Sequence, residues 1–332
     1  MALPTHPILP HDPQGLNRLN ENFGFLDTAL DSALSESAAL RLIANRIYPG
    51  MDLTEKHHAE IAAFPNVWEW IRARIRVGNF EDINVGDFIG FTAGENTIVS
   101  EVAGINTYRE YGDTAVPNHI DFISRDCWPE LRVWNRVNYN NGIAAMTQPF
   151  LASDIFAWLN GLQASVPNDT SVTMTNNPTL AGSLASVDYR TTGLLPQLPA
   201  QLRAVIVQKR VLMPRRHSAG VLLIDDNSWD WRDSGFLWLP SEMEMWGTNV
   251  WGSTFSPNQG WSVGGYRKYP IFDLAGKFRK GAGNGGAHSL WWTSTPRGGT
   301  STTVVIVGRG GYTSDTAAAH TSRRAPVCFR IA

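Results

Sequence analysis

The sequence has little cysteine, little charge and no long apolar run. Two cysteines, Cys127 and Cys328, occur among 332 residues, and no C-x-x-C pair or zinc-type His/Cys cluster is present. We therefore expect no disulfide framework, and the pattern is typical of a reducing compartment. Charged residues are 17% of the chain and the net charge is -2, so no strong field is directed at nucleic acid or an anionic membrane.

The beginning of the sequence lacks the pattern of a secretory signal. The first residues, MALPTHPILPHDP, have neither a basic start nor an apolar core. No apolar run approaches the roughly 20 residues of a membrane span. We therefore expect no membrane insertion and no export by the ordinary secretory route.

Tryptophan and glycine are abundant and concentrate towards the C-terminus. Eight of the 13 tryptophans and 16 of the 30 glycines lie at or after Trp229. Large rigid rings beside flexible backbone points predict a compact body with long, irregular loops. We expect Trp238, Trp291 and Trp292 to lie in the core of that body.

The first fifty residues have a different pattern. Five apolar residues follow one another at heptad-like spacings of three and four: Leu16, Leu19, Phe23, Leu26 and Leu30. Pro49 and Gly50 end the pattern. Two interpretations stay open, an amphipathic helix packed on its own domain or a self-associating helix that forms an oligomer stem. We expect residues 1–50 to be an arm with an oligomerising or attachment helix, and residues 51–332 to be the body.

The first part of the body combines helical and strand patterns. Residues 52–77 are predicted to be helical, with Thr54 as a cap and a break at Pro65. The segments VGDFIGF and NTIVSEVAGI predict strands, with a tight turn at residues 85–87 between strands. Residues 119–122 alternate polar and apolar, which predicts a half-buried strand. Ser153 is expected to cap a helix over residues 153–160.

The second part predicts short strands separated by loops. Residues 163–192 are rich in Ser, Thr, Asn and Gly and predict a long loop. Ser241 and Glu244 form an S-x-x-E capping box. The GAGNGG segment, residues 281–286, predicts a very flexible loop. Strands are expected at VLLID (221–225), 236–240, 269–272, 290–292, 303–307 and 327–331. Together these patterns predict an α+β fold.

Motifs for catalysis are weak. His57 and His58 are adjacent, so a helix cannot direct both rings to one face. No G-x-S-x-G and no complete P-loop occur, and no EF-hand loop suggests calcium. Acidic residues for a glycosidase pair are available: Asp225, Asp226, Glu242 and Glu244. We expect no catalytic residues, no metal and no cofactor, and a carbohydrate-active enzyme is the third hypothesis.

Several short motifs, in order, carry a resemblance. LWLPSEMEMWG, YPIF, WWTSTP, a glycine-flanked VVIVG and PVCFRI occur towards the C-terminus, after VGD, HIDF, SDIFAWLN and LPAQLRAVI. Over roughly residues 66–332 the chain resembles an uncharacterised domain family common in phage genomes. The closing segment of that family is similar to a C-type-lectin fold, as used by phage tropism determinants and by targets of diversity-generating retroelements.

The resemblance implies a virion component made in the host cytoplasm, at a tail tip or fibre, with residues 222–332 as the lectin-like core. The first hypothesis is that its loops bind a host-surface glycan or protein, while the N-terminal helix joins a homotrimer and other tail proteins. The second is a purely structural tail, collar or capsid-decoration protein.

Four predicted display loops mix aromatic, arginine, asparagine, serine and glycine residues, which is the composition of recognition surfaces: residues 249–266, 282–288, 297–302 and 309–320. The candidate receptor-binding residues are Asn284, His288, Arg297, Arg309, Tyr312, Asp315 and His320.

Overall fold

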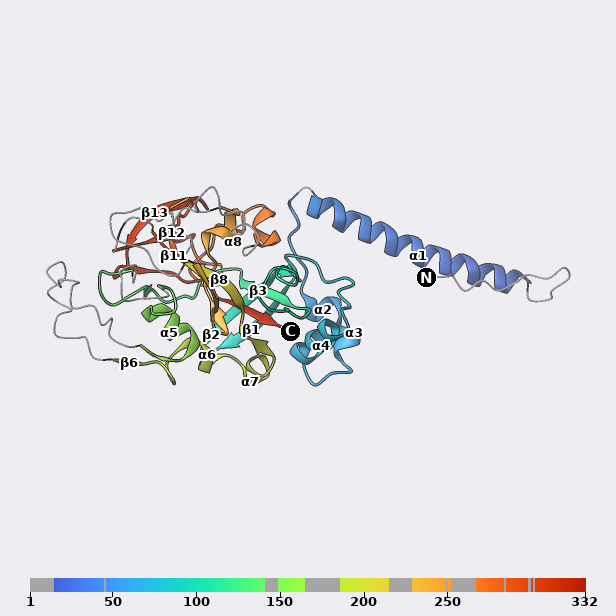
Figure 1. The fold of residues 1–332 in the computed structure, drawn as a ribbon. Coiled ribbons are helices and arrows are strands. Elements are labelled where there is room, and N and C mark those ends of the chain that lie inside the picture. The colour runs from blue at the N-terminus through green and yellow to red at the C-terminus, as the bar shows by residue number, and fades with distance from the viewer. Residues whose placement is uncertain are drawn as a thin grey trace. The chain divides into compact units, whose positions relative to one another are not determined.

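The computed structural model describes residues 15–44, 46–140, 149–164, 186–214, 229–248, 250–251, 267–283, 285–297, 300 and 302–332 (Figure 1). The chain divides into two compact units, residues 1–48 and 49–332. Helices and antiparallel sheets both occur, so the predicted mixed α+β class is confirmed. The predicted strand at 221–225 and most of the long loop at 163–192 lie outside the described residues.

The first unit contains one long helix, α1 (Gly15–Ala44). A helix was predicted here, and its apolar side chains are well exposed where they are described. Leu26, Leu30 and Leu34 are exposed by 50%, 57% and 59%. The side chains of the first three heptad-spaced apolar residues are outside the described part, namely Leu16, Leu19 and Phe23.

The second unit begins with three short helices, α2 (Leu53–Lys56), α3 (His58–Ile61) and α4 (Val67–Arg76). The expected cap Thr54 is wrong: Asp52 is the N-cap, because its carboxylate accepts from the Thr54 backbone N–H at 2.8 Å. The helical pattern does break around Pro65, and Asn66 then caps α4 by accepting from two backbone N–H groups.

A six-stranded antiparallel sheet forms the centre of this unit. Its path is β1-β2-β3-β15-β10, and β7 also pairs with β15. The strands are β1 (Phe88–Ala93), β2 (Asn96–Ile105), β3 (Ile120–Ser124), β7 (Ile206–Val207), β10 (Leu237–Trp238) and β15 (Cys328–Ile331). The last strand of the chain therefore lies beside a strand two hundred residues earlier. Residues 222–332 share this sheet with the preceding part of the body.

Two local predictions at this sheet need correction. Residues 85–87 do form a turn, but it leads from the helices into β1, and the β1–β2 hairpin turns at Gly94 and Glu95. Strand β3 is not half-buried, since all five of its residues are buried. Aromatic rings cover one side of β3, where Phe122 stacks on Phe329 at 5.0 Å and Trp68 meets both rings edge-on.

A second, three-stranded sheet has the order β11-β12-β13, from β11 (Trp291–Pro296), β12 (Thr303–Val307) and β13 (Thr313–Ala318). Trp291 and Trp292, at the start of β11, are fully buried, and Trp238 is 1% exposed. The predicted core position of these three tryptophans is confirmed. The Trp292 ring N–H donates to the Arg132 carbonyl at 2.8 Å, which ties the sheet to the preceding part of the chain.

Short helices and strand pairs complete the unit. Ser153 caps α5 (Asp154–Asn160) as predicted, and the Ser241–Glu244 capping box opens α8 (Glu242–Trp246). The expected strand at 269–272 is wrong, because Pro270–Asp273 is the 3-10 helix η4. The remaining helices are α6 (Leu194–Gln197) and α7 (Ala200–Arg203). The remaining strands pair as β4 (Arg132–Val133) with β14 (Ser322–Arg323), β5 (Gln163–Ala164) with β6 (Val187–Asp188), and β8 (Arg210–Pro214) with β9 (Trp229–Asp233).

Candidate recognition surface

The hairpin that joins β12 to β13, residues 308–312, holds an aromatic ring at the surface. The Gly308 N–H donates to the Tyr312 carbonyl at 2.8 Å, and the Gly311 N–H donates to the Gly308 carbonyl at 2.9 Å. The Tyr312 ring lies over the glycine backbone, because a Cβ atom on Gly308 or Gly310 would come within 2.6 or 3.1 Å of it. Yet Tyr312 is 63% exposed. The ring therefore packs on peptide backbone and remains open to solvent.

The hairpin rests on an aromatic support. Gly311 has φ +84, and a Cβ there would lie 2.9 Å from the Phe278 Cβ. Phe278 stacks on Trp246 at 5.4 Å, nearly parallel, and lies 4.8 Å from Phe272. The Trp291 ring N–H donates to the Phe278 carbonyl at 3.1 Å. The position of Tyr312 is thus fixed by contacts that reach the buried start of β11.

Two exposed arginines belong to the same part of the surface. Arg309 follows Gly308 in the hairpin, and the Arg279 Cγ would lie 3.2 Å from a Cβ on Gly311. Among the described side chains, neither guanidinium makes an ion pair with a carboxylate. We call the surface formed by these residues the hairpin surface: Tyr312, Arg309 and Arg279.

A buried carboxylate, that of Glu242, connects the start of β13 to residues 250–251. Glu242 is fully buried, and its oxygens accept from the backbone N–H groups of Val250 and Trp251 at 3.2 Å. The same carboxylate accepts from the Thr313 hydroxyl at 3.1 Å. Since Thr313 follows Tyr312, one side chain fixes both the 250–251 segment and the start of β13. Glu242 is therefore a positioning residue for this surface.

The opposite end of the three-stranded sheet carries a second group of candidates. Arg297 lies just after β11, with its guanidinium 5.4 Å from the centre of the Trp251 ring. Its backbone N–H donates to the Thr303 carbonyl at 3.1 Å. The buried Asn140 amide donates to the carbonyls of Thr300 and Thr303 at 2.9 and 2.7 Å. These bonds fasten the β11–β12 connection to the body.

The predicted receptor-binding residues thus separate into two groups. In the sheet register Trp291, Val307 and Thr313 stand opposite one another, so His288, Arg309 and Tyr312 occur at one end. Arg297 and His320 occur at the other end. Asn284 and the Asp315 side chain lie outside the described residues.

One of the predicted display loops is wrong in form, and a second is hydrogen-bonded to the body. Residues 313–318 of the expected 309–320 loop are strand β13, so Asp315 stands on a strand. The described part of the 281–286 segment is fastened, because the Asp126 carboxylate accepts from the N–H groups of Gly281 and Gly285 at 2.7 and 3.0 Å. Glycine is required here for close approach rather than for flexibility, since a Cβ on Gly286 would lie 2.2 Å from the Ala282 carbonyl oxygen.

A buried charge network, which the sequence reading missed, lies beside the central sheet. Arg330 on β15 makes a bidentate pair with Asp121 on β3 at 2.7 and 2.9 Å, and the Tyr269 hydroxyl donates to Asp121 at 3.1 Å. Nearby, Lys209 pairs with Glu244, whose carboxylate also accepts from the Tyr108 hydroxyl at 2.8 Å. A signal was available, because HIDF and CFRI each place one charge inside an apolar strand pattern.

The charges of this network balance. Burial alone would raise the pKa of Asp121, but the adjacent Arg330 outweighs it and lowers the pKa below the usual value. Burial lowers the pKa of His119, and its Nε2 accepts the Tyr108 backbone N–H at 3.2 Å, so the ring is neutral. Two carboxylates therefore face two cations, which stabilises the network without an external ion.

The two glutamates that the sequence offered for glycosidase chemistry have structural partners. Glu244 closes the capping box of α8 and pairs with Lys209. Glu242 binds backbone groups, as described above, and both side chains are buried. Asp225 and Asp226 lie outside the described residues.

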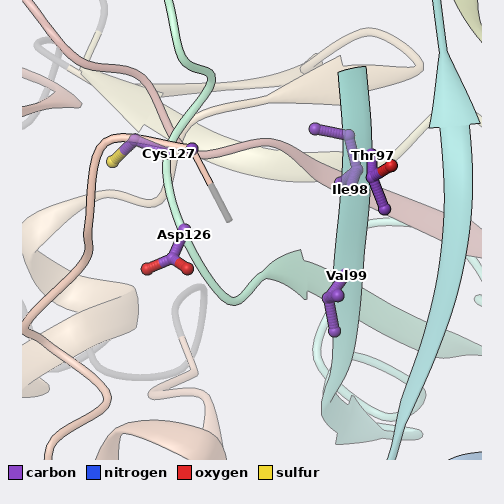
Figure 2. A pocket seen from close by; sticks show the side chains of 6 residues that line it. Thr97, Ile98, Val99, Asp126 and Cys127 are labelled. Atoms are coloured by element: carbon purple, nitrogen blue, oxygen red, sulfur yellow. The ribbon is translucent and has the colours of Figure 1, made fainter. Parts of the chain in front are cut away.

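A small pocket lies between β2 and the segment that follows β3 (Figure 2). It is lined by Thr97, Ile98, Val99, Asp126, Cys127 and Gly283. Its volume of about 10 Å³ is the space of roughly one water molecule, so it does not accommodate an organic substrate. Burial raises the pKa of the Cys127 and Cys328 thiols well above the usual value, in keeping with cysteines that fill space.

Within the described ranges, no group of three or more His, Cys, Asp or Glu side chains could hold a metal ion. In the same part of the chain, no helix has both the length and the apolar character needed to cross a membrane. Comparisons with family models, with curated proteins and with solved structures gave no match.

Proposed function

We propose that this chain is a phage virion protein that binds a host-surface receptor through the hairpin surface at the end of its three-stranded sheet. The observation that carries the proposal is Tyr312, an exposed ring fixed on the backbone of two glycines. Rigid aromatic rings beside arginine are typical anchors of binding surfaces, because they lose little conformational entropy on binding. The virion origin and the lectin-like fold of residues 222–332 rest on the sequence resemblance.

The N-terminal helix supports a second part of the proposal. Most helical stability in proteins comes from packing of an apolar face rather than from the helix propensity of the residues. Leu26 and Leu30 keep half or more of their surface exposed in the single chain. We propose that α1 forms a stem with copies of itself, most simply a homotrimer, which attaches the body to other tail proteins.

An adsorption experiment tests the receptor-binding function. The purified full-length chain, added to host cells before the source phage, is expected to compete for receptor and reduce adsorption. Tyr312→Ala is expected to weaken this competition at least tenfold. Arg203→Ala is a matched control, because Arg203 is exposed on α7, at the opposite edge of its unit from β13 in Figure 1. Equal competition by all three proteins would contradict the proposal.

The alternative is a structural tail, collar or decoration protein, in which the exposed ring and leucines contact neighbouring subunits. Immunogold labelling of intact virions separates the two. Label at the free end of the tail supports receptor binding. Label restricted to the capsid or to the interior of the tail favours the alternative.

A further inference from the structure

We infer that the ligand of the hairpin surface is an acidic saccharide, a sugar ring that carries carboxylate or phosphate groups. This inference rests on the proposed receptor-binding function and adds the ligand class to it. Three features of the surface lead to it, namely the presentation of the Tyr312 ring, the two exposed guanidinium groups and the bonded backbone of the hairpin.

The ring presents a platform of the size of one sugar. One side of Tyr312 packs on the backbone of Gly308 and Gly310, so the ring cannot turn inward, and 63% of the residue faces solvent. The face of an aromatic ring is electronegative. The C–H groups on the apolar face of a pyranose are weakly electropositive and match it.

The positive charge of two arginines near the Tyr312 hairpin indicates that the ligand is negatively charged. Arg309 is exposed within the hairpin and Arg279 is exposed next to Gly311, and neither has a carboxylate partner among the described side chains. Other arginines of this unit do pair with carboxylates, as Arg190 does with Asp188 and Arg210 with Asp113. A guanidinium presents a planar set of donors that fits carboxylate or phosphate oxygens in bidentate geometry. Two such groups on the surface that carries the ring therefore favour an anionic sugar over a neutral one.

The surface is also preorganised. Gly311 packs on Phe278, Phe278 stacks on Trp246, and Thr313 is bonded to the buried Glu242. A ligand that binds here orders few groups, so little of the interaction free energy is lost to ordering.

Binding of the full-length chain to defined oligosaccharides tests the inference. The probes are oligomers of galacturonate, glucuronate and mannuronate, their neutral methyl esters, a phosphate-bearing glycan and a polyglutamate peptide. At least one acidic saccharide is expected to bind at least tenfold more tightly than its neutral counterpart, with affinity that falls as salt is raised. The phosphate-bearing probe distinguishes phosphate from carboxylate as the anion.

Variants assign the two contributions. Arg309→Ala combined with Arg279→Ala is expected to remove the preference for the acid over the ester. Tyr312→Ala is expected to weaken binding of both, whereas Tyr312→Phe retains the ring and the affinity. Arg203→Ala is expected to change nothing.

The failures of the inference and of the proposed function are distinguishable. Equal binding of acid and ester, no binding of any acidic saccharide, or preference for polyglutamate would each overturn the inference. If adsorption still depended on Tyr312 in those cases, the receptor-binding function would stand with a different ligand class. Adsorption that is independent of Tyr312 would remove both.

Discussion

Substitution of Glu242 tests whether a buried carboxylate fixes the segments near the hairpin surface. In Glu242→Ala three donors of the described residues lose their acceptor, the N–H groups of Val250 and Trp251 and the hydroxyl of Thr313. Val250 is 46% exposed, so water can take its N–H. The other two donors each cost about 1–3 kcal/mol when left unsatisfied. Since the bonds are 3.1–3.2 Å long, the lower part of that range applies, and we expect a loss of about 2–4 kcal/mol.

The matched substitution Glu242→Gln separates charge from shape. One amide oxygen at the Oε2 position still accepts from Val250 and Trp251, and the amide nitrogen can donate to the Thr313 hydroxyl. Only the charge assistance of the bonds is lost, and we expect about 1–2 kcal/mol of destabilisation. Glu242→Ala should bind receptor more weakly than its loss of stability predicts, because the segment before β13 loses its bond to residue 242, whereas Glu242→Gln keeps that bond and should not.

Urea unfolding followed by tryptophan fluorescence measures these effects. Each of the 13 tryptophans lies at or after Trp68, so the signal reports the second unit alone. Glu69→Ala is the control, because Glu69 makes an exposed ion pair with Arg72 and such pairs contribute about 0–1 kcal/mol. A free energy of unfolding for Glu242→Ala within about 0.5 kcal/mol of the control would refute the reasoning.

Three further predictions concern the core, the helix and the thiols. The adjacent Arg330 guanidinium holds the pKa of Asp121 below its usual value. The Asp121 carboxylate therefore stabilises the fold above pH about 4, and this contribution is lost as the pH falls through the lowered pKa. Asp121→Asn should cost about 3–5 kcal/mol at neutral pH and should make acid unfolding less steep. Leu26→Asp with Leu30→Asp should shift the sedimenting species to a monomer without changing the fluorescence of the second unit. Cys127 and Cys328 should react with a thiol reagent only after urea unfolding, because both thiols are buried with raised pKa; rapid labelling of the native protein would contradict their burial.

Local features of the fold could be predicted from sequence because neighbouring residues determine them. The caps at Ser153 and Ser241 depend on an oxygen and a backbone N–H within three residues, and both formed as expected. The cap before α2 was misplaced by two residues, since Asp52 and Thr54 are both good caps and only the chain direction at Asp52 decides. Heptad-like spacing likewise predicted α1.

The candidate site was only partly predictable. Composition identified Tyr312 and Arg309, but Arg279 and Glu242 join the surface through contacts far apart in sequence. The Asp315 segment was assigned to a loop because Ser, Thr and Asp weaken its strand pattern, whereas pairing with β12 supplies the backbone bonds that make it a strand. Side-chain hydrogen bonds over such separations leave no periodic signal.

The buried pair of Asp121 and Arg330 shows why the end of the chain lies at the centre of the sheet. The two residues stand directly opposite in the antiparallel register of β3 and β15, so their side chains share one face. A slip of β15 by one residue would turn Arg330 to the face occupied by Phe122, Phe329 and Trp68, and it would leave Asp121 buried without its partner. The pair therefore contributes more to the choice of register than to net stability. Because β15 contacts β3, β7 and β10, that one choice aligns segments from three parts of the chain. Arg324, four residues before β15, forms a β-bridge with Trp291 at the start of β11. The position of β15 is thereby linked to the three-stranded sheet whose hairpin holds Tyr312.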